Sequence, residues 1–100
     1  MIKELNKENF DENTKSGLIL VEFYAPWCGY CKKQSEILNE LSNITIFKVN
    51  CDENPELAAE FGITGYPSFA VFKNGRAVHT FSGLHSKSDL MNILMHFFMN

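Results

Sequence analysis

The stretch LILVEFYAPWCGYC, residues 18–31, joins a continuous apolar run to two cysteines separated by two residues. The run Leu18–Ala25 is interrupted only by Glu22, a pattern typical of a central strand that is buried on both faces of a sheet. Glu22 is therefore predicted to be buried. The residues from Cys28 to about Leu41 favour a helix. Cys28 is then expected at a turn between a strand and a helix.

The composition predicts one domain over residues 1–100. Of these residues 45% are apolar and 13 are aromatic, which is enough to form a hydrophobic core. The net charge is −3, and the lysines and arginines are scattered, so nucleic acid is not an expected partner. Seven of the first fifteen residues are charged, so no apolar signal segment can be drawn there, and no later apolar run has the length of a membrane span. We expect a soluble, cytoplasmic protein.

The remaining predicted elements follow from changes in hydrophobic period. In chain order they are a strand at 2–5, a helix at 7–15, a strand at 44–49, a short helix from Pro55, a hairpin of strands 68–72 and 77–81, and a helix over 87–97. The predicted order is β-α-β-α-β-α-β-β-α. This order indicates an α/β protein with a mixed sheet and helices on both faces.

Short signals mark the ends of several of these elements. Asn54 precedes a proline and is expected to cap a helix that Gly62 closes. Asn74-Gly75 between two strand-like runs is the strongest short-range signal for a hairpin. Ser86, followed three residues later by Asp89, fits a capping box at the start of the last helix.

The cysteine pair Cys28 and Cys31 has three possible uses. A closed zinc site needs four ligands, and the chain has no second pair; Cys51 with a histidine would complete the set only through the fold. The histidines, His79, His85 and His96, are expected to be solvated. A structural disulfide that closes so small a loop would stabilise little. At the start of a helix, free N–H groups and the helix dipole favour a thiolate at Cys28, so a redox pair is the preferred interpretation and no metal is predicted.

VEFYAPWCGYC at 21–31, GYP at 65–67 and FKNG at 72–75 together resemble the thioredoxin family over essentially the whole chain. The resemblance implies the thioredoxin fold, a mixed five-stranded sheet flanked by four helices. It also implies a protein-disulfide reductase in which Cys28 is the nucleophile and Cys31 resolves the mixed disulfide. No bound cofactor is implied, only a redox-active disulfide between these two cysteines.

The resemblance also implies roles for residues around the pair. Glu22 would be the buried acid that accepts a proton from Cys31, and Lys48 would tune that acid. Tyr66-Pro67 matches the family's cis-proline loop, where an extended substrate chain would pair with the backbone. The substrate-binding residues implied are Trp27, Gly29, Tyr30, Tyr66, Pro67 and Gly83. Cys51 is expected to be a small, semi-buried residue.

Partners and alternatives follow from the same resemblance. It implies protein substrates with disulfides, an NADPH-dependent thioredoxin reductase as electron donor, a monomer, and a part in electron transport and cell redox homeostasis. Three alternatives stay open: an isomerase or oxidase of the same family, a dedicated reductant of one enzyme, and a non-catalytic docking module.

Tyr30 departs from the family pattern. Thioredoxins mostly have proline at this position and disulfide isomerases have histidine. A protonated histidine would stabilise the Cys28 thiolate, and neutral Tyr30 cannot. We therefore expect a reduction potential between about −270 mV and about −180 mV, nearer the reducing value.

Overall fold

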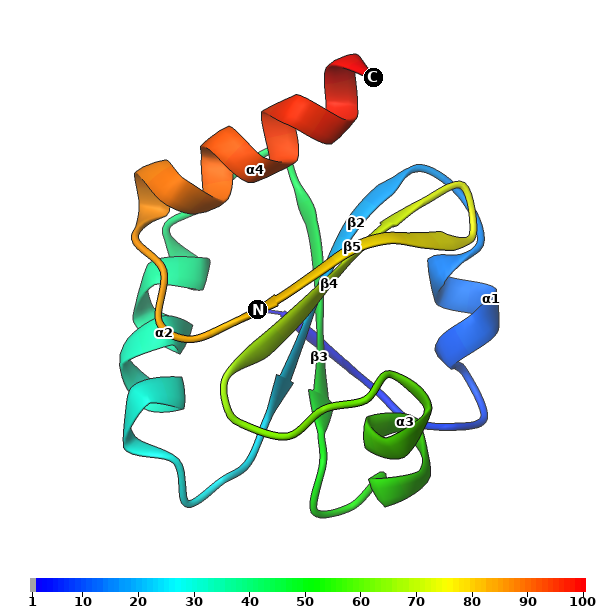
Figure 1. The fold of residues 1–100 in the computed structure, drawn as a ribbon, viewed down its shortest axis with the longest axis vertical. Helices are drawn as coiled ribbons and strands as arrows, with labels where there is room; N and C mark the ends of the chain where they lie inside the picture. The colour runs from blue at the N-terminus through cyan, green and yellow to red at the C-terminus, as the bar shows by residue number, and fades with distance from the viewer. Residues whose placement is uncertain (1) are drawn as a thin grey trace.

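The computed structural model describes residues 2–100 and contains the nine predicted elements in the predicted order (Figure 1). They are β1 (Lys3–Leu5), α1 (Phe10–Thr14), β2 (Leu18–Tyr24), α2 (Gly29–Asn39), β3 (Thr45–Asn50), α3 (Pro55–Glu60), β4 (Ser68–Lys73), β5 (Arg76–Ser82) and α4 (Lys87–Met99). The α/β class, with a mixed five-stranded sheet and four helices, is confirmed.

The strands lie in the order β1-β3-β2-β4-β5, so the apolar run quoted above is the central strand, β2. β2 pairs in parallel with β3 and antiparallel with β4. In this register Glu22 of β2 lies between Lys48 of β3 and Phe69 of β4. Because neighbouring residues in register point to the same face of a sheet, the two charged side chains share one face.

Two helices cover each face of the sheet (Figure 1). On one face, Phe10 of α1 and Leu57 of α3 belong to the same buried cluster as Phe23 of β2. On the other face, Leu38 of α2 and Leu90 of α4 belong to a second cluster. Successive side chains of β2 point to opposite faces of the sheet, so β2 contributes residues to both clusters of the core.

The hairpin between β4 and β5 turns at Asn74-Gly75, as predicted. Both residues have positive φ, 51° and 87°. This is the backbone that a type I′ turn requires, and asparagine and glycine adopt it most readily. A Cβ atom at Gly75 would also lie 3.2 Å from the carbonyl oxygen of Lys15, so the position has little room for a side chain.

One predicted helix start and one predicted capping bond need correction. The first helix begins at Phe10 rather than near Lys7, because Asn6 and Asn9 each accept the other's backbone N–H through the side-chain oxygen and hold this segment in a turn. α3 starts at Pro55 with Asn54 at its N-cap position, as predicted, but the Asn54 side chain makes no capping hydrogen bond. Its amide donates instead to the carbonyl oxygen of Asn50, at 3.0 Å. The predicted cap of α4 is confirmed, since Ser86 Oγ accepts the N–H of Asp89 at 3.1 Å.

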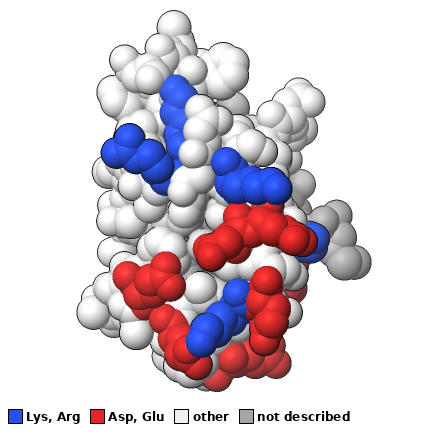
Figure 2. Space-filling model, turned by 90° about the vertical axis from the view of Figure 1, so that its right-hand side faces the viewer, with Lys and Arg blue, Asp and Glu red and all other residues white. Residues whose placement is uncertain are grey.

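Charge is unevenly distributed on the side of the molecule that carries α1 and α3. Figure 2 shows most acidic side chains of this side toward the end where α3 lies, and most basic ones toward the opposite end. The acidic end is also the end at which β2 leads into α2 (Figure 1). A partner that approaches this end from that side therefore meets negative charge.

No helix within residues 2–100 is long and apolar enough to cross a membrane.

Candidate active site

Cys28 lies at the turn between β2 and α2. The turn is closed by a hydrogen bond from the N–H of Cys28 to the carbonyl oxygen of Ala25, at 3.1 Å. Cys28 has extended backbone and occupies the N-cap of α2, and its Sγ accepts the N–H of Cys31 at 3.2 Å. A sulfur in this place faces the positive end of the helix dipole. The predicted setting at a strand-to-helix turn is confirmed.

Cys28 and Cys31 are both free thiols and both buried. They form a small cluster with Ala25, against which Tyr24 and Tyr66 pack. Within residues 2–100, no three His, Cys, Asp or Glu side chains are grouped as metal ligands would be. The chemistry that these two thiols can perform as they stand is thiol–disulfide exchange.

Glu22 lies behind the pair, on the sheet face covered by α2 and α4. Its exposed fraction is 0%, which confirms the predicted burial. Neither carboxylate oxygen has a hydrogen-bond partner among the described residues. Burial raises the pKa of Glu22 to about 7, and the charge of Lys48 acts in the opposite direction. Near neutral pH this carboxyl group can therefore both take up and release a proton.

Lys48 is held close to Glu22 but not in hydrogen-bond contact with it. The register places the two residues side by side, with Nζ 3.8 Å from Oε1 of Glu22. The ammonium group instead donates to Ser35 Oγ of α2 at 3.3 Å and lies 4.4 Å from the centre of the Tyr24 ring. The Tyr24 hydroxyl in turn donates to the carboxylate of Glu4, at 2.8–2.9 Å. The structure thus brings the predicted pair together and adds three residues that sequence reasoning missed.

The thiol of Cys31 is protected from ionisation in the dithiol state. Burial raises its pKa to about 12, with further contributions from the neighbouring Cys28 sulfur and from Glu22. Cys31 is therefore a thiol at neutral pH until one of these influences changes.

The predicted docking residues gather around the pair. Tyr66-Pro67 is a cis peptide, as predicted. The Tyr66 ring meets Trp27 edge to face, with ring centres 5.6 Å apart. The N–H of Gly83 donates to the carbonyl oxygen of Pro67 at 2.8 Å. Trp27 and Tyr30 are 69% and 68% exposed, so they present aromatic surface to solvent. Gly29, in the first turn of α2, has open space around its Cα.

Cys51 is buried rather than semi-buried, with 4% of its surface exposed. It follows β3, and its N–H donates to the carbonyl oxygen of Tyr24 at 2.9 Å. Burial raises its pKa to about 11, which keeps it a thiol at neutral pH. Such a cysteine behaves as a small apolar residue and reacts slowly.

Gln34 and His85 are two further residues that sequence reasoning missed. Gln34 is fully buried, and its side chain bonds to the backbone of His85. A signal existed, because the spacing of Cys31, Gln34 and Leu38 places all three on one helical face. The prediction that His85 is solvated was wrong. Its ring is half-buried and meets Phe69 and Phe81 edge to face.

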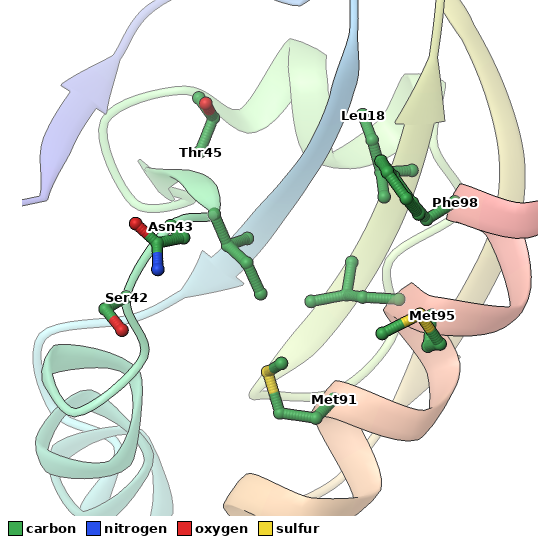
Figure 3. A pocket seen from close by; sticks show the side chains of 9 residues that line it. Leu18, Ser42, Asn43, Thr45, Met91, Met95 and Phe98 are labelled. Atoms are coloured by element: carbon green, nitrogen blue, oxygen red, sulfur yellow. The ribbon is translucent and has the colours of Figure 1, made fainter.

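A groove of about 540 Å³ lies between α4 and the segment that leads into β3 (Figure 3). Its lining includes Met91, Met95 and Phe98 and none of the predicted site residues. The cysteine pair lies outside this groove: both thiols are buried at the turn, next to the exposed rings of Trp27 and Tyr30. A site at the surface suits reaction with a disulfide that is part of a folded protein, because such a substrate cannot enter a closed pocket.

Two thiols at the start of a helix, backed by a buried acid and flanked by a cis-proline loop, define a thiol–disulfide oxidoreductase. The sequence model of the family Thioredoxin matches residues 1–96. The thioredoxin of Chlamydia pneumoniae is 40% identical over 98 residues, which are 94% of this chain and 96% of that protein. The thioredoxin of Staphylococcus haemolyticus is 40% identical, covering 93% and 94%, and that of Chlamydia caviae 36%, covering 94% and 96%. The chain belongs to the thioredoxin family and is a disulfide reductase.

Proposed function

We propose that the protein reduces disulfides in other proteins, with Cys28 as the nucleophile and Cys31 as the resolving thiol. The observation that carries the proposal is the position of Cys28 Sγ at the N-cap of α2, where it accepts the N–H of Cys31. A donor in this place favours the negative charge of a thiolate, and the thiolate is the attacking species in exchange.

The first step forms a mixed disulfide. The Cys28 thiolate attacks one sulfur of the substrate disulfide, the substrate S–S bond breaks, and the second substrate sulfur leaves as a thiolate that takes up a proton. In the second step Cys31 attacks Cys28 Sγ. The bond between Cys28 and the substrate breaks, and the substrate leaves with two thiols. The two electrons pass to the substrate sulfurs, and the protein is left oxidised with a Cys28–Cys31 disulfide, so the step needs no bound cofactor.

Glu22 is the base that prepares Cys31 for the second step. The proton moves from the Cys31 thiol to the Glu22 carboxylate, directly or through a water molecule. Lys48 tunes this exchange through its charge, 3.8 Å from Glu22. Part of the high Cys31 pKa comes from the neighbouring Cys28 sulfur. That contribution disappears when Cys28 is bonded to substrate, so Cys31 becomes easier to deprotonate only after the first step.

The docking surface consists of Trp27, Gly29, Tyr30, Tyr66, Pro67 and Gly83. In the described part of the chain, no backbone hydrogen bond uses the N–H or C=O of Tyr66. These free groups suit an extended substrate segment that adds as a strand beside the cis-proline. The exposed rings of Trp27 and Tyr30 then cover the apolar part of the substrate. Tyr30 also underlies the expectation of an intermediate reduction potential, which stays a prediction.

The proposed partners are proteins that contain disulfides, together with an NADPH-dependent thioredoxin reductase that returns the oxidised pair to dithiol. The protein acts as a monomer in the cytoplasm and contributes to electron transport and cell redox homeostasis. These assignments rest on membership of the thioredoxin family.

The Cys31→Ser variant tests the proposal. With insulin as the disulfide substrate, this variant should accumulate a mixed disulfide on Cys28, visible on a non-reducing gel and located by peptide mass spectrometry. The Cys28→Ser variant should form none, and Cys51→Ser should reduce insulin as the unchanged protein does. Turnover of insulin with dithiothreitol above the uncatalysed rate by a Cys28→Ser, Cys31→Ser double variant would contradict the assignment, and binding of protein partners that is unchanged in this double variant would favour a docking module.

A further inference from the structure

Gln34 is a buried amide that the proposed reaction does not use. Its exposed fraction is 0%. Nε2 donates to the carbonyl oxygen of His85 at 3.0 Å, and Oε1 accepts the N–H of the same residue at 2.8 Å. These two hydrogen bonds tie α2 to the segment between β5 and α4, because His85 lies 51 residues after Gln34 in the chain. The amide acts toward that segment as a neighbouring strand would.

The chemical type of this residue is informative. The other buried residues of α2 are Cys31 and Leu38, and burying an amide between them costs free energy unless each polar atom is bonded. Methionine or leucine would fill similar space without that requirement. Gln34 therefore contributes something that an apolar residue cannot, and the contribution is a fixed position for the backbone of His85.

The segment held by Gln34 leads directly to the docking surface. Nδ1 of His85 lies 2.7 Å from the carbonyl oxygen of Gly83. Because a carbonyl oxygen only accepts, Nδ1 carries the proton and donates. Gly83, whose φ is 95°, donates its own N–H to the carbonyl oxygen of Pro67 at 2.8 Å. A continuous series of hydrogen bonds thus runs from Gln34 through His85 and Gly83 to the cis-proline.

We propose that Gln34 is a positioning residue for substrate docking, which holds the segment from Gly83 to His85 at a fixed place beside Pro67. The inference rests on the proposed function, because it assumes that protein substrates dock along Gly83 and the cis-proline loop. Gln34 lies one turn after Cys31 on the same helix, so the element that carries the thiols also sets the place of the docking segment.

The Gln34→Met variant tests the proposal. Methionine is similar in length and lacks both hydrogen bonds. The KM for insulin should rise about tenfold, while kcat stays within about twofold, because a displaced docking segment weakens substrate binding and leaves the thiols in place. The second-order rate with 5,5′-dithiobis(2-nitrobenzoate), a small disulfide that needs no extended docking surface, should also stay within about twofold.

Two further variants separate positioning from stability. Ile37→Ala removes a half-buried apolar side chain from the same helix, lowers stability, and should leave the KM for insulin unchanged. Gln34→Glu keeps the acceptor for the N–H of His85 and, when protonated, regains a donor for the carbonyl oxygen. The ratio of the KM for insulin of Gln34→Glu to that of the unchanged protein should therefore fall toward one as the pH is lowered.

The outcomes are distinct. An unchanged KM for insulin in Gln34→Met, or an equal loss with insulin and with the small disulfide, would overturn the positioning role. An equal rise of KM in Ile37→Ala would assign the effect to stability and overturn it too. Faster hydrogen exchange of the His85 backbone amide in Gln34→Met would show, without an activity assay, that the hydrogen bonds from Gln34 hold this segment. Unchanged exchange would contradict the positioning role. Failure of the proposed function shows in the cysteine variants, whatever these measurements give.

Discussion

The two faces of the central sheet are built differently. On the face covered by α1 and α3, four aromatic rings meet one another with centres 5.4–5.6 Å apart: Phe10, Phe23, Phe61 and Phe72. On the face covered by α2 and α4, two polar side chains, Glu22 and Gln34, are completely buried. The first face has the composition of a core that only stabilises. The second gives up part of that stability to hold groups that react or orient.

The two buried polar residues also differ from each other. Both polar atoms of Gln34 have partners, whereas neither carboxylate oxygen of Glu22 has one in the described chain. A satisfied amide holds its surroundings in place, and an unsatisfied carboxyl group is poised to bind a proton. The difference between a positioning residue and a reacting one is therefore visible in their hydrogen bonds.

The largest expected effect on stability is at the aromatic face. Phe23→Ala should lower the free energy of unfolding by about 3–5 kcal/mol, because Phe23 is fully buried and its removal leaves a cavity. Chemical denaturation measures the loss, and insulin reduction per folded molecule should be retained. Phe23→Leu is the matched control and should cost less than half as much. A loss below about 1 kcal/mol in Phe23→Ala would break the view that this face stabilises.

The effect of Glu22 on stability should depend on pH. Its pKa is raised from 4.5 to about 7 in the folded protein, so the folded state binds the proton more tightly than the unfolded state. The free energy of unfolding of the unchanged protein should therefore fall as the pH rises from about 4.5 to about 7, by about 3 kcal/mol, and then stay low.

The free energy of unfolding of Glu22→Gln should not fall in this way, because glutamine does not ionise. The difference in the free energy of unfolding, variant minus unchanged protein, should therefore rise by about 3 kcal/mol between pH 4.5 and pH 7. Denaturation at pH 4.5 and pH 8.5 measures the difference. The same variant should resolve the mixed disulfide roughly a hundredfold more slowly, because Cys31 loses its base. A pH-independent difference between the two proteins would remove the contrast between the reactive and the stabilising face.

The smallest expected effect concerns the helix starts. Ser86 caps α4 through its hydroxyl, whereas Asn54 before α3 makes no such bond. Ser86→Ala should cost about 1 kcal/mol in chemical denaturation. Asn54→Ala is the control on the other face and should cost less, because it removes only the bond to the carbonyl of Asn50. If Ser86→Ala and Asn54→Ala lowered the free energy of unfolding equally, the capping bond of α4 would give it no advantage over α3.

Much of the architecture could be predicted because its signals are local. Asn74-Gly75 predicted the hairpin, and the nearly unbroken apolar run Leu18–Ala25 predicted a central strand with Glu22 buried in it. Local signals can also compete with one another. Before Phe10, the side chains of Asn6 and Asn9 stabilise a turn, and the predicted start of the first helix was wrong for that reason.

The sequence by itself determined the order of the elements, the turn that carries Cys28 and the burial of Glu22, since each depends on residues close together in the chain. That Lys48 lies beside Glu22 was implied only by the family resemblance, and the register of β3 on β2 is what places it there. Only the tertiary structure placed Gln34 against His85, across 51 residues. Hydrophobic period tells which face of an element is buried, whereas the partner that it meets depends on how distant elements pack.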